Sequence, residues 1–99
     1  MGSMKIKVKI KKDICYAKLM IKHEMLTYSQ AQKRGTQANF VTSIEAKVNG
    51  HSVYKLLSSQ FLAKNPLIKF RFYANHGDNL QVTWIDLLGY SDTRFITIR

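Results

Sequence analysis

The sequence predicts an all-β protein, an immunoglobulin-like antiparallel β-sandwich of about seven strands. Hydrophobic and polar side chains alternate almost throughout the chain, and this period of two residues is that of a half-buried strand. Turn-forming residues recur about every ten positions. No stretch shows the 3.6-residue period of an amphipathic helix. An up-and-down or OB-type barrel is the alternative that the same pattern allows.

The first two strands are expected over residues 5–10 and 14–23. In the first, lysines at every second position alternate with Ile6, Val8 and Ile10. In the second, one face carries Cys15, Ala17, Leu19 and Ile21, and the other carries Tyr16, Lys18, Met20 and Lys22. Each segment therefore predicts a strand with one buried face and one exposed face.

Five further strands are expected over residues 40–49, 51–57, 68–74, 80–84 and 94–99. Asn49-Gly50 predicts a tight hairpin between the first two of these, because both residues tolerate the positive φ angles of a type I′ turn. Two stretches break the alternation. Residues 24–39 are expected to form a long, basic, irregular loop. Residues 58–66 have room for one helical turn before the proline at 66.

The length of 99 residues fits one domain. Met1-Gly2-Ser3 before Met4 is typical of a remnant of an expression vector, so the domain is expected to cover residues 4–99. No run approaches the ~20 apolar residues that span a bilayer. The strand pattern begins directly after Met4 without an apolar leader, so no export signal of its own is expected.

Charge is the unusual quantity, because sixteen Lys and Arg against six Asp and Glu give a net charge of +10. Such a field attracts acidic partners and other anions. The lysines at 5, 7 and 9 can protect an edge strand from aggregation, or they can belong to an anion-binding face. We name Lys18, Lys22, Lys33 and Arg34 as candidates for an anion-attracting basic face. Few aromatic residues are interleaved with these cations, which does not favour nucleic-acid binding.

Motifs that would indicate an enzyme are missing from the sequence. There is no metal-binding pair of histidines or cysteines, no phosphate-binding glycine loop and no nucleophile elbow. Cys15 is expected to be a small buried residue rather than a reactive thiol. Trp84 is expected to fill the core rather than anchor a partner. The sequence therefore predicts a binding module without catalytic residues, cofactor or metal.

An ordered set of motifs runs along the chain. Residues 17–25 read AKLMIKHEM, a segment that ends in His-x-Met, and Asn49-Gly50, Asn65-Pro66, Gly77 and Trp84-x-Asp86-x-x-Gly89 follow. In their order and spacing these motifs resemble those of the SoxZ family. The chain departs from the family pattern at Leu26-Thr27-Tyr28, where members typically have Glu-Thr-Gly, and at Leu67, where many have an aromatic residue.

The resemblance implies the non-catalytic half of the SoxYZ carrier. In that system SoxY bears a cysteine on a flexible C-terminal arm, which carries sulfur intermediates of thiosulfate oxidation while other Sox proteins bind transiently. SoxZ binds SoxY without a covalent link and typically reaches the periplasm together with its folded partner. The same location is expected here, or the cytoplasm if the chain does not share the family's role.

We expect partner contacts from apolar residues on the outward phase of their strands, namely Tyr16, Met20, Val41 and Tyr73. By the same resemblance, His23 and Met25 are expected near the path of the carrier arm, with packing at the end of a strand as the alternative. Other functions stay open: a basic β-domain that binds nucleic acid or another acidic protein, and a free-standing adhesin or chaperone subunit. Homodimerisation of the isolated chain also stays open.

Overall fold

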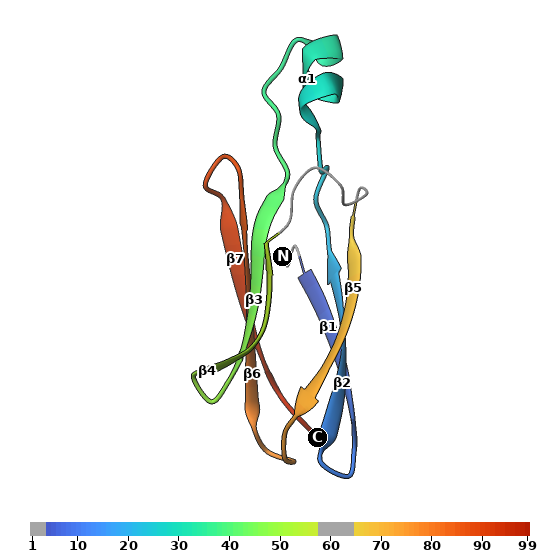
Figure 1. Ribbon diagram of the computed structural model, residues 1–99, viewed down its shortest axis with the longest axis vertical. Helices are drawn as coiled ribbons and strands as arrows, with labels where there is room; N and C mark the ends of the chain where they lie inside the picture. The colour runs from blue at the N-terminus through green and yellow to red at the C-terminus, as the bar shows by residue number, and fades with distance from the viewer. Residues whose placement is uncertain (1–3, 58–64) are drawn as a thin grey trace.

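The computed structural model describes residues 4–57 and 65–99. Within these residues the chain forms seven strands and one short helix (Figure 1). In chain order the elements are β1 (Met4–Lys11), β2 (Ile14–Ile21), α1 (Tyr28–Arg34), β3 (Val41–Val48), β4 (His51–Leu57), β5 (Leu67–Tyr73), β6 (Asn79–Asp86) and β7 (Ser91–Thr97). The helical turn expected within residues 58–66 falls mostly outside the described residues.

The strands form two antiparallel sheets that face each other. One sheet has the order β1-β2-β5 and the other has the order β4-β3-β6-β7. Figure 1 shows the two layers side by side along the length of the molecule. This arrangement confirms the predicted immunoglobulin-like sandwich, in a form in which the fourth strand pairs with the third.

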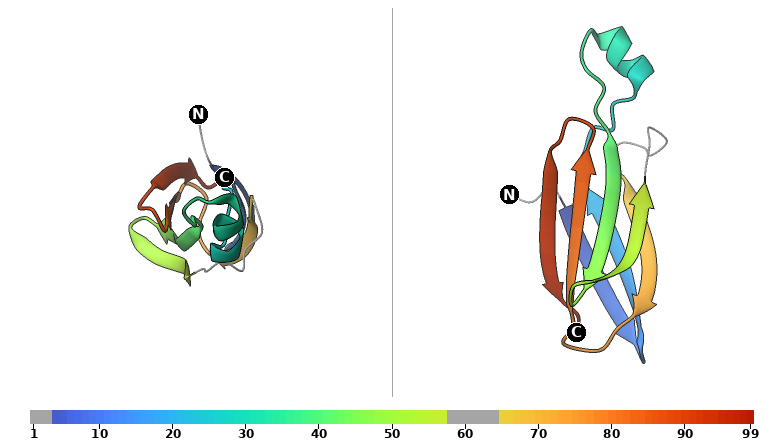
Figure 2. Two further views of the ribbon diagram at one scale, coloured as in Figure 1. Left: turned by 90° about the horizontal axis from the view of Figure 1, so that it is seen from above. Right: turned by 60° about the vertical axis from the view of Figure 1, so that its left-hand side comes forward.

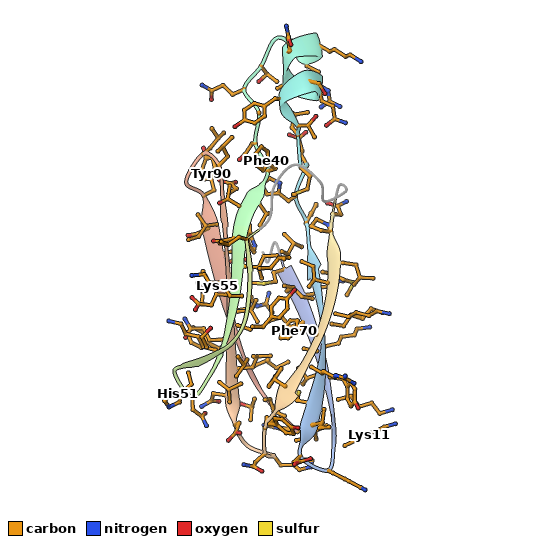
Figure 3. The ribbon with its side chains drawn as sticks, viewed as in Figure 1. Lys11, Phe40, His51, Lys55, Phe70 and Tyr90 are labelled. Carbon is orange, nitrogen blue, oxygen red and sulfur yellow. The ribbon has the colours of Figure 1, made fainter. Side chains whose placement is uncertain are left out.

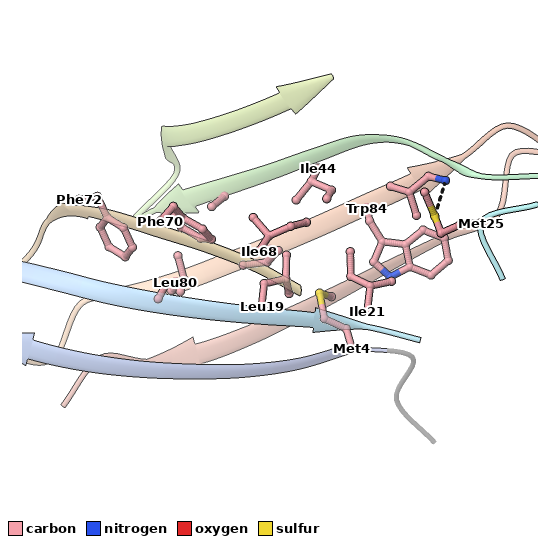
Figure 4. Close-up of a cluster of buried hydrophobic side chains, with 14 of the residues drawn as sticks. Met4, Leu19, Ile21, Met25, Ile44, Ile68, Phe70, Phe72, Leu80 and Trp84 are labelled. Carbon is pink, nitrogen blue, oxygen red and sulfur yellow. Dashed lines mark hydrogen bonds between the residues drawn. The ribbon is translucent and has the colours of Figure 1, made fainter. Parts of the chain in front are cut away.

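The core lies between the sheets and is built from the inward positions of both (Figure 4). Leu19 and Ile21 of β2 face this core, as do Ile44 of β3 and Leu80 of β6. Burying one such aliphatic side chain contributes about 1.5–3 kcal/mol. Trp84 is also buried, which confirms its predicted place in the core.

The Asn49-Gly50 turn is formed as predicted. Both residues have positive φ angles, 50° and 88°, and the turn joins paired residues Val48 and His51. These angles match the type I′ turn that suits the twist of a two-stranded hairpin.

The expectation of an irregular loop over residues 24–39 is wrong, because this stretch contains α1. Thr27 and Gln30 form a reciprocal capping box at its start, and Gly35 closes it in the left-handed conformation. Leu26 and Asn39 pair through two backbone hydrogen bonds at the base of the excursion. Figures 1 and 2 show α1 standing clear of both sheets at one end of the sandwich.

The predicted outward position of Val41 is also wrong. Strict alternation from Ile44 would place Val41 on the outer face, but its side chain is fully buried. The pairing of β3 with β6 shifts register between Val41 and Ser43. Such a bulge inserts one residue and reverses the phase of alternation beyond it, so Val41 belongs to the core.

Candidate functional site

A buried carboxylate organises the end of the sandwich from which α1 projects. Asp86, the last residue of β6, is 4% exposed. Its Oδ2 accepts hydrogen bonds from His23 Nε2 and Asn39 Nδ2, both at 3.0 Å. Its Oδ1 accepts one from the backbone N–H of Tyr90 at 2.8 Å. These bonds join the β6–β7 turn to the segment after β2 and the segment before β3.

His23 is held in one tautomer by its two partners. The backbone N–H of Met25 donates to Nδ1 at 3.0 Å, so Nδ1 is an acceptor. Nε2 therefore carries the hydrogen that is donated to Asp86. The side chain is 7% exposed, and its ring lies edge-on to Trp84 with centroids 5.4 Å apart. Both nitrogens of this imidazole are thus occupied by internal partners.

The pKa of Asp86 lies below its usual value. Burial is the largest single influence and acts to raise the pKa, because it penalises the charged form. The hydrogen bonds from His23, Asn39 and Tyr90 act to lower the pKa, and together they outweigh burial. The carboxylate is therefore kept ionised by its donors, as expected of a structural anchor.

Met25 packs into this same end of the molecule. Its side chain is buried and its φ angle is positive, 53°. Its Sδ accepts a hydrogen bond from the backbone N–H of Val41 at 3.3 Å, drawn as the dashed line in Figure 4. Such a placement favours the packing alternative for Met25.

The anchored turn presents exposed apolar side chains. Leu87, Leu88 and Tyr90 lie at the β6–β7 turn, and Ile85 precedes them on β6. The two most exposed are Leu88 at 47% and Tyr90 at 67%. We call these four residues the apolar tip. Contiguous exposed apolar residues are typical of a surface that binds another protein.

Backbone hydrogen bonds hold the apolar tip in place. The Leu87 N–H donates to the carbonyl of Phe40 at 2.9 Å, and the Leu88 N–H donates to Asn39 Oδ1 at 3.3 Å. The Gly89 N–H donates to the carbonyl of Asp86 at 3.1 Å. Figure 3 shows Tyr90 and Phe40 at the same end of the sandwich, beside the base of the α1 excursion. The tip is therefore a fixed surface rather than a free loop.

A second surface covers the outside of the β1-β2-β5 sheet. Its outward positions carry seven cations, which we call the basic face: Lys5, Lys7, Lys9, Lys11, Lys18, Lys69 and Arg71. None of these three strands contains an aspartate or glutamate. Tyr16, Met20, Leu67 and Tyr73 share the same face.

The middle of the basic face is hollowed. Five of its cations and Tyr16 line a shallow hollow of about 600 Å³, the cations being Lys7, Lys9, Lys18, Lys69 and Arg71. The outer face of the other sheet differs, because Glu45 lies opposite Lys55 and Thr83 is hydrogen-bonded to Thr93 at 2.9 Å. The positive charge of the sandwich is thus concentrated on one side.

The residues predicted as partner contacts fall in two places. Tyr16, Met20 and Tyr73 lie on the basic face, where Tyr16 and Tyr73 are exposed. Val41, His23 and Met25 are buried near Asp86. The predicted set therefore does not form one continuous surface.

The cations predicted to attract anions are also separated. Lys18 lies at the centre of the basic face. Lys22 is exposed just beyond β2, and Lys33 and Arg34 form the last turn of α1. Arg34 approaches Glu24 at 4.0 Å with both side chains largely exposed, which is a weak interaction.

Sequence reasoning missed two features of these surfaces. It did not connect Asp86 with Asn39, because 47 positions separate them and no local pattern predicts that contact. It also missed the apolar tip, although the run Leu87-Leu88-Gly89-Tyr90 shows a glycine turn flanked by apolar residues. That run was a usable signal, since turns are ordinarily polar.

Cys15 is fully buried on the inner side of β2, as predicted. Burial raises the pKa of its thiol and outweighs a backbone hydrogen bond that lowers it. A protonated, inaccessible thiol is a poor nucleophile. The arrangement gives Cys15 a packing role.

Across residues 4–57 and 65–99, no three His, Cys, Asp or Glu side chains gather closely enough to hold a metal ion. Within the same ranges, no helix has the length and apolar character needed to cross a membrane.

Comparison with known proteins agrees with the resemblance seen in the sequence. The family model described as "Sulphur oxidation protein SoxZ" matches residues 4–96, nearly the whole chain. No curated protein matches the sequence. The match covers all seven strands except the last residue of β7. The chain therefore belongs to the SoxZ family of sulfur oxidation proteins.

Proposed function

We propose that this chain is the non-catalytic subunit of a sulfur carrier and docks a SoxY-like subunit. That partner bears sulfur intermediates of thiosulfate oxidation on a cysteine of its C-terminal arm. The observation that carries this proposal is the SoxZ family match over residues 4–96. The chain is proposed to act in the periplasm, which it reaches together with its folded partner, and to meet other Sox proteins transiently.

The apolar tip is the surface proposed to bind the SoxY-like subunit. Its four side chains are uncharged and exposed, and one of them is Tyr90. This composition matches the centres of protein interfaces, which are depleted of charge and enriched in aromatic residues such as tyrosine. The hydrogen bonds around Asp86 fix the turn before binding. A fixed surface loses less conformational entropy on association.

Docking rather than catalysis is supported by the state of the reactive groups. The Cys15 thiol is buried among core residues. The His23 imidazole has both nitrogens engaged, with Met25 and Asp86, so it has no free nitrogen to serve as a general base for a substrate. Sulfur chemistry is therefore proposed to take place on the partner's arm.

Co-expression tests the proposal. The chain should co-purify with a tagged SoxY-like protein that ends in Gly-Gly-Cys-Gly-Gly, as a stable complex on size-exclusion chromatography. The chain alone should leave thiosulfate unchanged. After incubation with thiosulfate, the other Sox proteins and an electron acceptor, the complex should carry a sulfur adduct on the arm cysteine, detected by mass spectrometry. Separate elution of the two chains, or thiosulfate turnover by this chain alone, would contradict the proposal.

A further inference from the structure

We propose that the basic face is a second docking surface, which binds an acidic segment of another protein. This surface lies on the β1-β2-β5 sheet, whereas the apolar tip belongs to the β6–β7 turn of the opposite sheet. It goes beyond the docking function proposed above and does not depend on it.

The register of the strands aligns the cations in rows. Lys18 of β2 lies between Lys7 of β1 and Lys69 of β5, and the next row contains Lys9, Tyr16 and Arg71. Neighbouring strands are about 4.8 Å apart, and residues i and i+2 on one strand about 6.7 Å apart. The cations of these two rows therefore lie on one small surface with no acidic side chain from the same strands to compensate them.

Protection of a sheet edge explains only part of this pattern. β1 is an edge strand, and lysines there prevent pairing with another sheet. β2 is the central strand and has no free edge, so protection of an edge does not explain Lys18. Like charges directly opposite each other destabilise a sheet. A row of three lysines thus costs stability in the free protein, and an anionic ligand would turn that repulsion into attraction.

The shape and chemistry of the face favour an acidic protein segment. The cations converge on a hollow of about 600 Å³, which a flat bilayer surface would bridge rather than fill. Two aromatic residues line the hollow, Phe70 and Tyr16. Phe70 is buried in the core and only Tyr16 of these two is exposed, whereas binding of single-stranded nucleic acid uses a succession of stacking rings. Met20 and Leu67 lie beside the hollow, in the same row as Lys5. They would contact apolar residues that flank the carboxylates of the bound acidic segment.

Two variants of equal charge test the proposal. Lys7→Gln/Lys18→Gln/Lys69→Gln removes the central row of the face. Lys33→Gln/Lys47→Gln/Lys55→Gln removes three cations outside the face, and each variant lowers the net charge of +10 by three. The probes are a fluorescent hexaglutamate peptide, phosphatidylglycerol vesicles and a single-stranded oligonucleotide, with circular dichroism to verify folding.

The proposal predicts that hexaglutamate binds and that binding weakens with added salt. Loss of the central row should raise its Kd about tenfold, and the control should raise it less than about twofold. Equal weakening by both variants would show an effect of net charge alone and overturn the proposal. So would tighter binding of vesicles or oligonucleotide through the same three lysines. Complex formation with the SoxY-like subunit should survive in both variants, which separates this test from that of the apolar tip.

Discussion

His23 and Asp86 are joined by a 3.0 Å hydrogen bond across 63 positions of sequence, from the imidazole Nε2 to the carboxylate Oδ2. This bond ties the segment that follows β2 to the end of β6, and thus links the two sheets at the end of the sandwich that carries the apolar tip. Because the tip is attached to Asp86 through its own backbone, the stability of the pair and the shape of the tip are coupled.

Replacing Asp86 by asparagine should lower the free energy of unfolding by about 1–3 kcal/mol. The asparagine amide keeps one oxygen acceptor and places a donor where His23 and Asn39, or the Tyr90 N–H, already donate. Urea unfolding measures the loss. The matched control, Asp13→Asn, changes an exposed carboxylate in the β1–β2 turn and should cost less than about 0.5 kcal/mol. Equal stability of the two variants would mean that Asp86 is not an anchor.

Stability should decrease in acid because of the same residue. The pKa of Asp86 is lowered in the folded chain, from an ordinary value of about 4, so the unfolded chain binds a proton more readily. The stabilisation that the ionised Asp86 gives is fully present above the pKa of this carboxyl in the unfolded chain. It is lost as the pH falls through the pKa in the folded chain. Urea midpoints measured from neutral pH into this acidic range should fall for the natural protein.

The Asp86→Asn variant should show a shallower decrease over the same range. Some dependence of stability on pH should persist in the variant, because the backbone N–H of Asn75 and the side chain of Asn49 lower the pKa of Asp78. Parallel curves for the natural protein and the variant would show that Asp86 does not contribute to the acid sensitivity.

Removing a charge from the centre of the basic face should stabilise the free protein. Lys18 lies between two lysines, and relief of this repulsion should raise the free energy of unfolding of Lys18→Gln by about 0.2–1 kcal/mol. Lys33→Gln on α1 removes the same charge away from the row and should change stability much less. Thermal unfolding at low and high salt measures the difference, which should shrink as salt screens the repulsion. A destabilised Lys18→Gln would contradict the argument that the row is costly.

Cys15 should be unreactive in the folded protein. The side chain is fully buried and burial raises the pKa of the thiol, so a thiol reagent such as dithionitrobenzoate should react only when the chain opens. The reaction in native buffer should be slower by orders of magnitude than in denaturing urea. Rapid native labelling would instead identify an accessible thiol and reopen a redox role.

Alternation in the sequence predicted the sandwich because strands such as β2, β5 and β6 bury one face. The lysines of β1 and the inward Cys15, Leu19 and Ile21 of β2 follow that rule residue by residue. Val41 does not follow it, since a β-bulge depends on pairing with a distant strand and leaves no mark in local alternation.

The helix and the anchored end were harder to predict for different reasons. α1 is a short helix with only Ala31 buried, too short for a 3.6-residue period to stand out. Its capping box at Thr27 and Gln30 and its terminal Gly35 were nevertheless visible in the sequence. The grouping of His23, Asn39 and Asp86 depends on tertiary contacts alone, which no spacing rule supplies.

The most direct test of the docking account is the affinity for the SoxY-like subunit, measured by isothermal titration with two matched variants. Leu88→Asp places a charge on the apolar tip, whereas Phe95→Asp places one on β7, at a side chain that is 71% exposed. The account predicts that Leu88→Asp weakens binding at least about tenfold and that Phe95→Asp binds like the natural chain. Unchanged binding by Leu88→Asp, or no binding by the natural chain, would contradict it.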